Sequence, residues 1–147
     1  MRVYLDNCCY NRPYDDQLQL NIQIETLAKL EIQREIRKKH LELVTSYILE
    51  AENAMNPFNR KRADIQSFID ENTSIFVSEA QDKTVRKIAA EIMATGIHLM
   101  DACHIACAML AQCDVFLSTD KRVLKYQSDK LRICNPATFI IERGNGK

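Results

Sequence analysis

The feature that most constrains the fold is a nearly unbroken run of small and apolar residues at 99–111, followed closely by a second apolar segment at 115–117. The first run is too short and too interrupted to span a membrane, so it predicts a buried helix. The second predicts a short buried strand. Asp101 lies in the first turn of the predicted helix, and Asp120 follows the predicted strand. Functional sites of parallel sheets lie beyond the carboxyl ends of the strands, so both acids are candidate functional residues.

The rest of the chain alternates short apolar segments with longer helical patterns. Strands are predicted at residues 3–5, 43–45, 74–77 and 131–134. Helices are predicted at residues 17–39, 46–55, 59–70, 79–95 and 121–124, with Asp15 or Asp16 capping the first and Ser46 the second. This alternation is typical of an α/β fold with a central, largely parallel sheet flanked by helices. We expect one domain over residues 1–143 and a polar C-terminal tail at residues 144–147.

Composition and charge argue against several classes of function. The formal net charge of the 147 residues is zero, so no general attraction to nucleic acid is expected. Basic groups at residues 60–62 and 121–125 either bind an RNA backbone or form a solvated helix face. The three glycines form no phosphate-binding loop, which argues against a nucleotide cofactor. The six cysteines lie in apolar segments, and no secretory leader or membrane span is apparent, so we expect a cytoplasmic protein with reduced thiols.

Four acids are predicted at a strand end or in a helix beside one: Asp6, Asp101, Asp120 and an acid near residue 50. The ends of parallel strands converge on one edge of a sheet. Carboxylates that share a pocket repel one another unless a hard cation such as Mg²⁺ or Mn²⁺ binds them. A metal held in this way activates water and supports displacement at phosphate. The expected substrate is therefore a phosphodiester supplied from outside.

Two glutamates compete for the position near residue 50. On a helix, Glu52 shares a face with Ile48, Leu49 and Met55, whereas Glu50 lies on a more polar face. A carboxylate on an inward face requires a functional reason, which favours Glu52. Glu50 remains the alternative.

These residues also have purely structural interpretations. Asp101 suits the first turn of any helix, and Asp120 suits the N-cap of the helix that follows it. Cys103, His104 and Cys107 lack the paired spacing of a zinc site and are predicted to be core residues. Only the joint pattern of the acids indicates a functional site.

Several motifs recur in the order found in one known family. They are the segments 4–7 (YLDN) and 11–16 (NRPYDD), the segments 44–46, 52–53 and 56–57, and the stronger motifs 101–108 (DACHIACA) and 118–122 (STDKR). With these motifs the sequence resembles PIN-domain proteins and, more loosely, the VapC-type toxins of bacterial toxin–antitoxin modules. The motifs cover nearly the whole chain.

The resemblance implies a single PIN-like nuclease domain and an Mg²⁺- or Mn²⁺-dependent endoribonuclease acting on single-stranded RNA. The residues implied to be catalytic and metal-binding are Asp6, Glu52, Asp101 and Asp120. The residues implied to contact substrate are Asn7, Arg12, Thr119 and Lys121, with Thr119 supporting the site by hydrogen bonding. Toxins of this type are typically homodimers inhibited by an antitoxin, so RNA, an antitoxin and a second copy are the expected partners.

The chain departs from the family pattern in two places. Many members carry a further acid directly after the position of Asp120, where this chain has Lys121, and this leaves open whether one metal ion binds or two. The predicted helix at 17–39 is also longer than in the shorter toxins. The alternative function is a catalytically silent PIN-like module that binds RNA or protein. A phosphatase with Asp6 as nucleophile is disfavoured, because position 8 is a cysteine rather than an acid.

Overall fold

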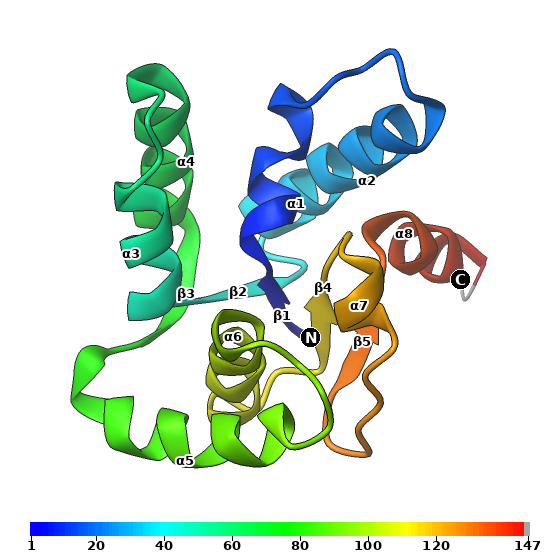
Figure 1. Cartoon of the computed structure of the whole chain (residues 1–147). Coiled ribbons are helices and arrows are strands. Elements are labelled where there is room, and N and C mark those ends of the chain that lie inside the picture. Colours follow the sequence, from blue (N-terminus) through cyan, green and yellow to red (C-terminus); the bar gives the residue numbers. More distant parts are fainter. Residues whose placement is uncertain (146–147) are drawn as a thin grey trace.

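The computed structural model describes residues 1–145. Its centre is a five-stranded sheet in the order β3-β2-β1-β4-β5, in which every neighbouring pair is parallel (Figure 1). The strands are β1 (Arg2–Leu5), β2 (Glu42–Ser46), β3 (Thr73–Val77), β4 (Val115–Leu117) and β5 (Arg132–Cys134). Tyr4 of the middle strand pairs with Val44 on one side and with Phe116 on the other. The predicted parallel sheet is confirmed.

Helices follow the strands in alternation, as an α/β fold requires. The α-helices are α1 (Asn7–Asn11), α2 (Leu20–Arg37), α3 (Tyr47–Ala54), α4 (Asn59–Asn72), α5 (Asp82–Met93), α6 (Leu99–Leu110), α7 (Lys121–Leu124) and α8 (Pro136–Asn145). Two short 3₁₀ turns, η1 (Arg12–Tyr14) and η2 (Glu79–Gln81), precede α2 and α5. The predicted α/β class, with helices flanking the sheet, is confirmed.

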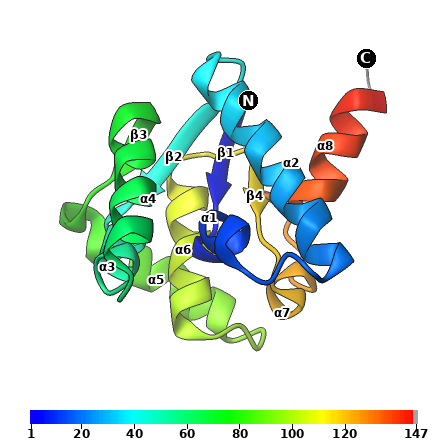
Figure 2. The same cartoon turned by 90° about the horizontal axis from the view of Figure 1, so that it is seen from above.

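The core divides into two layers because side chains alternate along a strand. Tyr4 points to one face of the sheet, where it packs with buried residues of α5 and α6. Val3 and Leu5 point to the other face and pack with buried residues of α1, α2, α4 and α8. Figure 1 shows α5 and α6 on one side of the strands and α1, α2 and α8 on the other. Figure 2 shows α1 and α7 at the end toward which β1 points.

Two helices were not predicted. Helix α1 follows β1 directly, with Asp6 as its N-cap. Helix α8 spans the end of the predicted domain and the first two residues of the predicted polar tail. At its start, the side chain of Asn135 accepts a hydrogen bond from the Ala137 N–H at 2.8 Å, and Pro136 occupies the first helical position. The predicted domain boundary at residue 143 therefore falls inside this helix, and residues 146–147 lie outside the described part of the chain.

The long predicted helix is present as α2, but its cap and its buried face differ from expectation. Its N-cap is Gln19, whereas Asp16 accepts from the Leu18 N–H in the preceding turn, so the prediction that Asp15 or Asp16 caps this helix is wrong. A buried polar stripe runs along one face. Its members are Glu25, Lys29 and Gln33, spaced four residues apart.

All six cysteines are free thiols, and five of them are buried. Cys103 and Cys107 lie in the core with α5 and α6, as predicted. Across residues 1–145, no helix combines the length and the apolar character needed to cross a membrane.

Candidate active site

Three predicted acids lie at one edge of the sheet. Asp6 directly follows β1, and its N–H donates to the carbonyl of Leu117 at the end of the neighbouring β4, at 2.9 Å. Asp120 lies three residues after the end of β4, and Asp101 lies in the first turn of α6. Because β1 and β4 are adjacent and parallel, their carboxyl ends bring Asp6 and Asp120 to the same edge.

Asp6 is only 5% exposed, and hydrogen bonds hold its carboxylate in a fixed orientation. One carboxylate oxygen accepts from the Asn7 N–H at 2.7 Å, and the other accepts from the Ser118 hydroxyl at 3.0 Å. Ser118 also accepts from the Asp120 N–H at 3.1 Å, so one buried hydroxyl connects the two acids. The resemblance implied Thr119 for this supporting role, but the structure gives it to Ser118. The backbone N–H of Thr119 donates instead to the Cys8 sulfur at 3.4 Å.

The negative charge of Asp101 is disfavoured by its surroundings. Its pKa is raised, first by partial burial and then by the negative charges of Asp6 and Asp120, while His104 and Arg122 act in the opposite direction. The charges of Asp6 and Asp120 both act on Asp101, as is expected of acids at the same edge of the sheet. Such a site favours a bound proton or a cation.

The Asp120 carboxylate already interacts with the helix that follows it, α7. It is the N-cap of α7, accepting from the Arg122 N–H at 2.9 Å, and it pairs with the Arg122 guanidinium at 3.3 Å. Burial acts to raise the pKa of Asp120, but the backbone and side chain of Arg122 outweigh it, and the pKa is lowered. The capping interpretation of Asp120 is therefore confirmed, and it coexists with a place beside the other acids.

Glu52 reaches the same region through His104. His104 is 1% exposed and lies one turn after Asp101 on α6, where its Nε2 contacts the Glu52 carboxylate and its Nδ1 lies 2.6 Å from the Tyr4 hydroxyl. The Tyr4 hydroxyl lies 2.6 Å from Ser46 Oγ. When both ring nitrogens carry protons, each donates, to Glu52 and to Tyr4 respectively.

His104 lies among three of the four acids. Burial acts to lower the pKa of His104, but the hydrogen bond to Glu52 and the charges of Asp6, Glu52 and Asp101 outweigh it and raise the pKa. Glu50 lies elsewhere, beside Tyr47 in a pocket that also includes Glu79. Glu52, and not Glu50, therefore contacts the histidine that lies one turn after Asp101.

The donor set suits a hard divalent cation by its chemistry, because it consists of carboxylate and hydroxyl oxygens and repels itself without one. The side chains are not gathered around a single point. Within residues 1–145, no three Asp, Glu, His or Cys side chains are close enough together to hold one metal ion. The Asp120 carboxylate is already paired with the Arg122 guanidinium, and the Glu52 carboxylate is already in contact with His104.

The residues implied to contact substrate differ in whether their side chains are free to bind it. Lys121 is exposed at the start of α7. Asn7 accepts a side-chain hydrogen bond from Asn11 at 3.1 Å. Arg12 forms ion pairs with Glu25 at 2.8 Å and Asp15 at 3.0 Å, so it joins η1 to α2 rather than offering a free guanidinium to phosphate. This corrects the expectation for Arg12.

Two solved structures share the fold. A chain in the crystal structure of VapBC2 from Rickettsia felis bound to a DNA fragment from their promoter aligns with a TM-score of 0.56 and 10% identity, over 92% of this chain and 98% of that chain. A chain in the structure of FitAB bound to an IR36 DNA fragment aligns with a TM-score of 0.57 and 16% identity, over 92% and 95% respectively. No family model matches the sequence. No curated protein matches it either. At these identities the similarity shows a shared fold.

Proposed function

We propose that this chain is a divalent-metal-dependent endoribonuclease that cleaves single-stranded RNA, and that it acts in the cytoplasm as the toxin of a type II toxin–antitoxin module. The observation that carries the proposal is that Asp6 and Asp120, from distant segments, meet through the buried Ser118 hydroxyl at the carboxyl ends of the adjacent parallel strands β1 and β4. The negative charges of both acids also act to raise the pKa of Asp101. The fold shared with chains of VapBC2 and FitAB supports it.

Each acid has a role in the proposal. Asp6, Glu52, Asp101 and Asp120 would hold Mg²⁺ or Mn²⁺, which when bound supplies charge neutralisation and an activated water. Ser118 and the Asn7 N–H fix the Asp6 carboxylate, and His104 fixes that of Glu52. Lys121 offers a positive charge to the RNA backbone beside Asp120.

A silent RNA- or protein-binding module is the second candidate. The observation that favours it is the pairing of Arg122 with Asp120, which gives that acid a structural partner within the chain. In this case Asp6 and Asp120 serve as helix N-caps, and the protein remains folded despite the half-buried charge of Asp101.

The test is RNA cleavage together with thermal melting, each with and without Mn²⁺. We expect Mn²⁺ to raise the melting temperature of the wild type but not of Asp101→Asn. Asp6→Asn and Asp101→Asn should each reduce cleavage roughly a hundredfold or more, as the loss of a group that acts on the reacting atoms does. Without metal, Asp101→Asn should melt at or above the wild-type temperature, because the repulsion is relieved.

Glu50 and Glu52 provide a matched pair of controls. Glu52→Gln should reduce cleavage, whereas Glu50→Gln, in its separate pocket, should leave it unchanged. Cleavage that persists in both aspartate variants would refute the nuclease. If the wild type showed neither a metal-dependent melting shift nor cleavage, the silent module would replace it.

Assembly is part of the same proposal. Helix α2 exposes an apolar stripe of Leu20, Ile24 and Leu27, with Leu20 and Leu27 each 69% exposed. Contiguous apolar surface of this kind marks interaction sites.

We propose that the chain forms a homodimer and binds an antitoxin protein. Light scattering should show a dimer for the wild type and a monomer with unchanged melting for Leu20→Glu/Leu27→Glu if this stripe is the dimer contact. A monomeric wild type would contradict the homodimer.

A further inference from the structure

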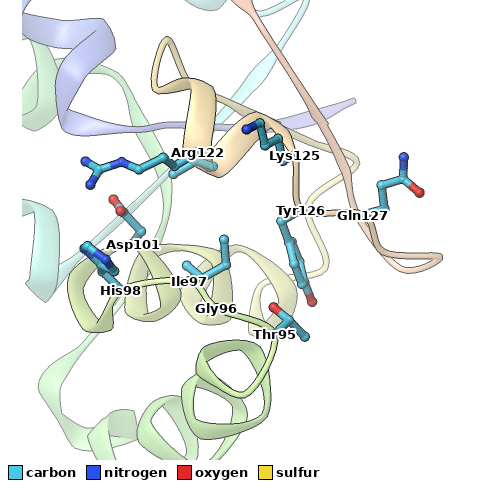
Figure 3. Close-up of a pocket in the computed structure, with 10 residues that line it drawn as sticks. Thr95, Gly96, Ile97, His98, Asp101, Arg122, Lys125, Tyr126 and Gln127 are labelled. Atoms are coloured by element: carbon cyan, nitrogen blue, oxygen red, sulfur yellow. The ribbon is translucent and has the colours of Figure 1, made fainter.

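A pocket of about 400 Å³ opens directly beside Asp101. Its walls come from two loops that are distant in sequence: the loop joining α5 to α6, and the segment from Arg122 to Gln127. In Figure 3, Asp101 and Arg122 lie at one side of the pocket, Tyr126 and Lys125 lie at the other, and Ile97 lies between them. Ligand pockets have volumes of roughly 300–1,000 Å³, so this one has room for a ligand of about one nucleotide.

The lining combines two kinds of group that a nucleotide requires. Tyr126 and Ile97 provide flat and apolar surface, on which a base can stack. Arg122 and Lys125 provide positive charge. Lys125 is exposed and forms no ion pair with any residue of the described chain, so its charge is available to a phosphate.

Arg122 connects the pocket to the acids. Its guanidinium meets the Asp120 carboxylate through contacts of 3.3 and 3.5 Å, longer than a well-formed charge-assisted hydrogen bond. The Arg122 side chain is 70% exposed, so it is free to turn toward an anion in the pocket. A phosphate bound there would draw the Arg122 guanidinium away from Asp120 and release that carboxylate from its ion pair, while the Arg122 N–H would still cap α7 on one of its oxygens.

We propose that this pocket binds one nucleotide of a single-stranded RNA, with its base against Tyr126 and Ile97 and its phosphate between Arg122 and Lys125. The inference rests on the proposed function for its biological meaning, and it adds the place where the RNA is bound beside the acids. Nucleotide binding and the release of Asp120 are then coupled.

The test measures binding without cleavage. A short fluorescein-labelled single-stranded RNA is titrated with the protein in EDTA, at fixed low salt, and fluorescence anisotropy is recorded. Tyr126→Leu removes the stacking surface and should weaken binding at least about fivefold. Tyr126→Phe keeps the ring and should bind as the wild type does. Lys125→Ala should also weaken binding and flatten its salt dependence.

The controls lie outside the pocket. Lys38→Ala removes a lysine just after α2, at the opposite edge of the sheet, and should leave the affinity unchanged. Tyr14→Leu alters an exposed tyrosine that lines a different pocket with Arg60 and Lys61. A loss of affinity in Tyr14→Leu, with none in Tyr126→Leu, would place the RNA elsewhere and overturn the inference. Melting curves of each variant show that the fold is intact.

This inference and the proposed nuclease can fail separately. Affinity that depends on Tyr126 and Lys125, in a protein that cleaves nothing with Mn²⁺, would support the pocket and refute the nuclease. Metal-dependent cleavage, with affinity unaffected by both pocket variants, would support the nuclease and refute the pocket. A wild type that does not bind the RNA in EDTA would also refute the pocket.

Discussion

Two buried tyrosines on opposite faces of the sheet show how much the surroundings of one hydroxyl matter. The Tyr4 hydroxyl lies 2.6 Å from both His104 and Ser46. The Tyr10 hydroxyl is also fully buried, but it has no hydrogen-bond partner among the described residues. Both rings fill the core, so the two positions differ mainly in whether the hydroxyl is satisfied.

The phenylalanine variants of these tyrosines should therefore have opposite effects. Tyr4→Phe removes the hydrogen-bond partner of the buried His104 Nδ1 and one of the two partners of Ser46 Oγ, and should lower the free energy of unfolding by about 1–3 kcal/mol. Tyr10→Phe removes an unsatisfied hydroxyl and should leave the free energy of unfolding unchanged or raise it by up to about 1 kcal/mol. Urea denaturation of the two variants measures the difference. Equal destabilisation by both would contradict this account.

Lys29 is a second residue whose surroundings oppose its charge. It is 4% exposed, and burial lowers its pKa to about 8, while its ammonium lies 5.6 Å from the Tyr10 ring centroid. In the unfolded chain a lysine retains its proton to about pH 10.4. Between those values the unfolded chain binds more protons than the folded chain, so stability contributed at this residue rises with pH.

Lys29→Met keeps the aliphatic stem but not the charge. At pH 7 it should raise the free energy of unfolding by about 1–3 kcal/mol, because a difference of one pKa unit between folded and unfolded chain is about 1.4 kcal/mol. The advantage over the wild type should shrink as the pH rises from 8 to 10. Denaturation of both proteins at these pH values measures it. A gap that is constant with pH would show that Lys29 does not titrate as described.

The candidate site could be predicted at its acids but not at their partners. Asp6, Asp101 and Asp120 were recognisable because strand ends and first helical turns are visible in the pattern of apolar residues. Ser118 was not, because a single hydroxyl next to Thr119 carries no pattern of its own. The ion pairs of Arg12 were also hidden, because they depend on where α2 passes over η1.

At the scale of elements, the missed helices share one cause. A residue that ends a strand can also begin a helix. Asp6 ends β1 and caps α1, while Asn135 ends β5 and caps α8. In the sequence, each residue only follows an apolar strand segment, and nothing in that pattern shows that a helix begins there. For α2 the helix was predicted, but the stripe of Glu25, Lys29 and Gln33 was not, because those side chains are buried only through contacts with other elements.

The turn that ends α5 depends on a glycine. Gly96 has a φ of +105°, a conformation that residues with a Cβ rarely adopt, although a Cβ there would meet no atom of the described chain within 4 Å. Gly96→Ala should therefore destabilise the protein by about 1–2 kcal/mol through backbone strain alone. Gly144→Ala, inside α8, should instead be neutral or stabilising by up to about 1 kcal/mol. Thermal melting distinguishes them, and equal shifts would contradict the role of Gly96.

At the scale of the whole molecule, the class of fold was predictable because strands and helices alternate with different apolar periods. The helix at the C-terminal end of the predicted domain was not. Phe139 of α8 is 1% exposed and packs into the same core layer as Val3 and Leu5, so this helix contributes to the core of the domain.

Shortening one buried and one exposed side chain of α8 tests this contribution. Phe139→Ala should lower the free energy of unfolding by about 3–5 kcal/mol, the effect of removing a buried aromatic ring. Ile141→Ala, at a side chain that is 60% exposed, should change it by less than about 0.5 kcal/mol. Chemical denaturation measures both. If the Phe139→Ala variant were as stable as the Ile141→Ala variant, α8 would not contribute to the core as described.

The strand order also links the timing of biosynthesis to the assembly of the candidate site. β1 leaves the ribosome first, but it is the middle strand of the sheet, and its partner β4 is made more than a hundred residues later. The contacts of Asp6 with Ser118 therefore form only after most of the chain has been translated. Under the proposed function this delay is protective, because a nascent chain could not assemble the acids and cut its own messenger RNA until translation of that message is nearly complete.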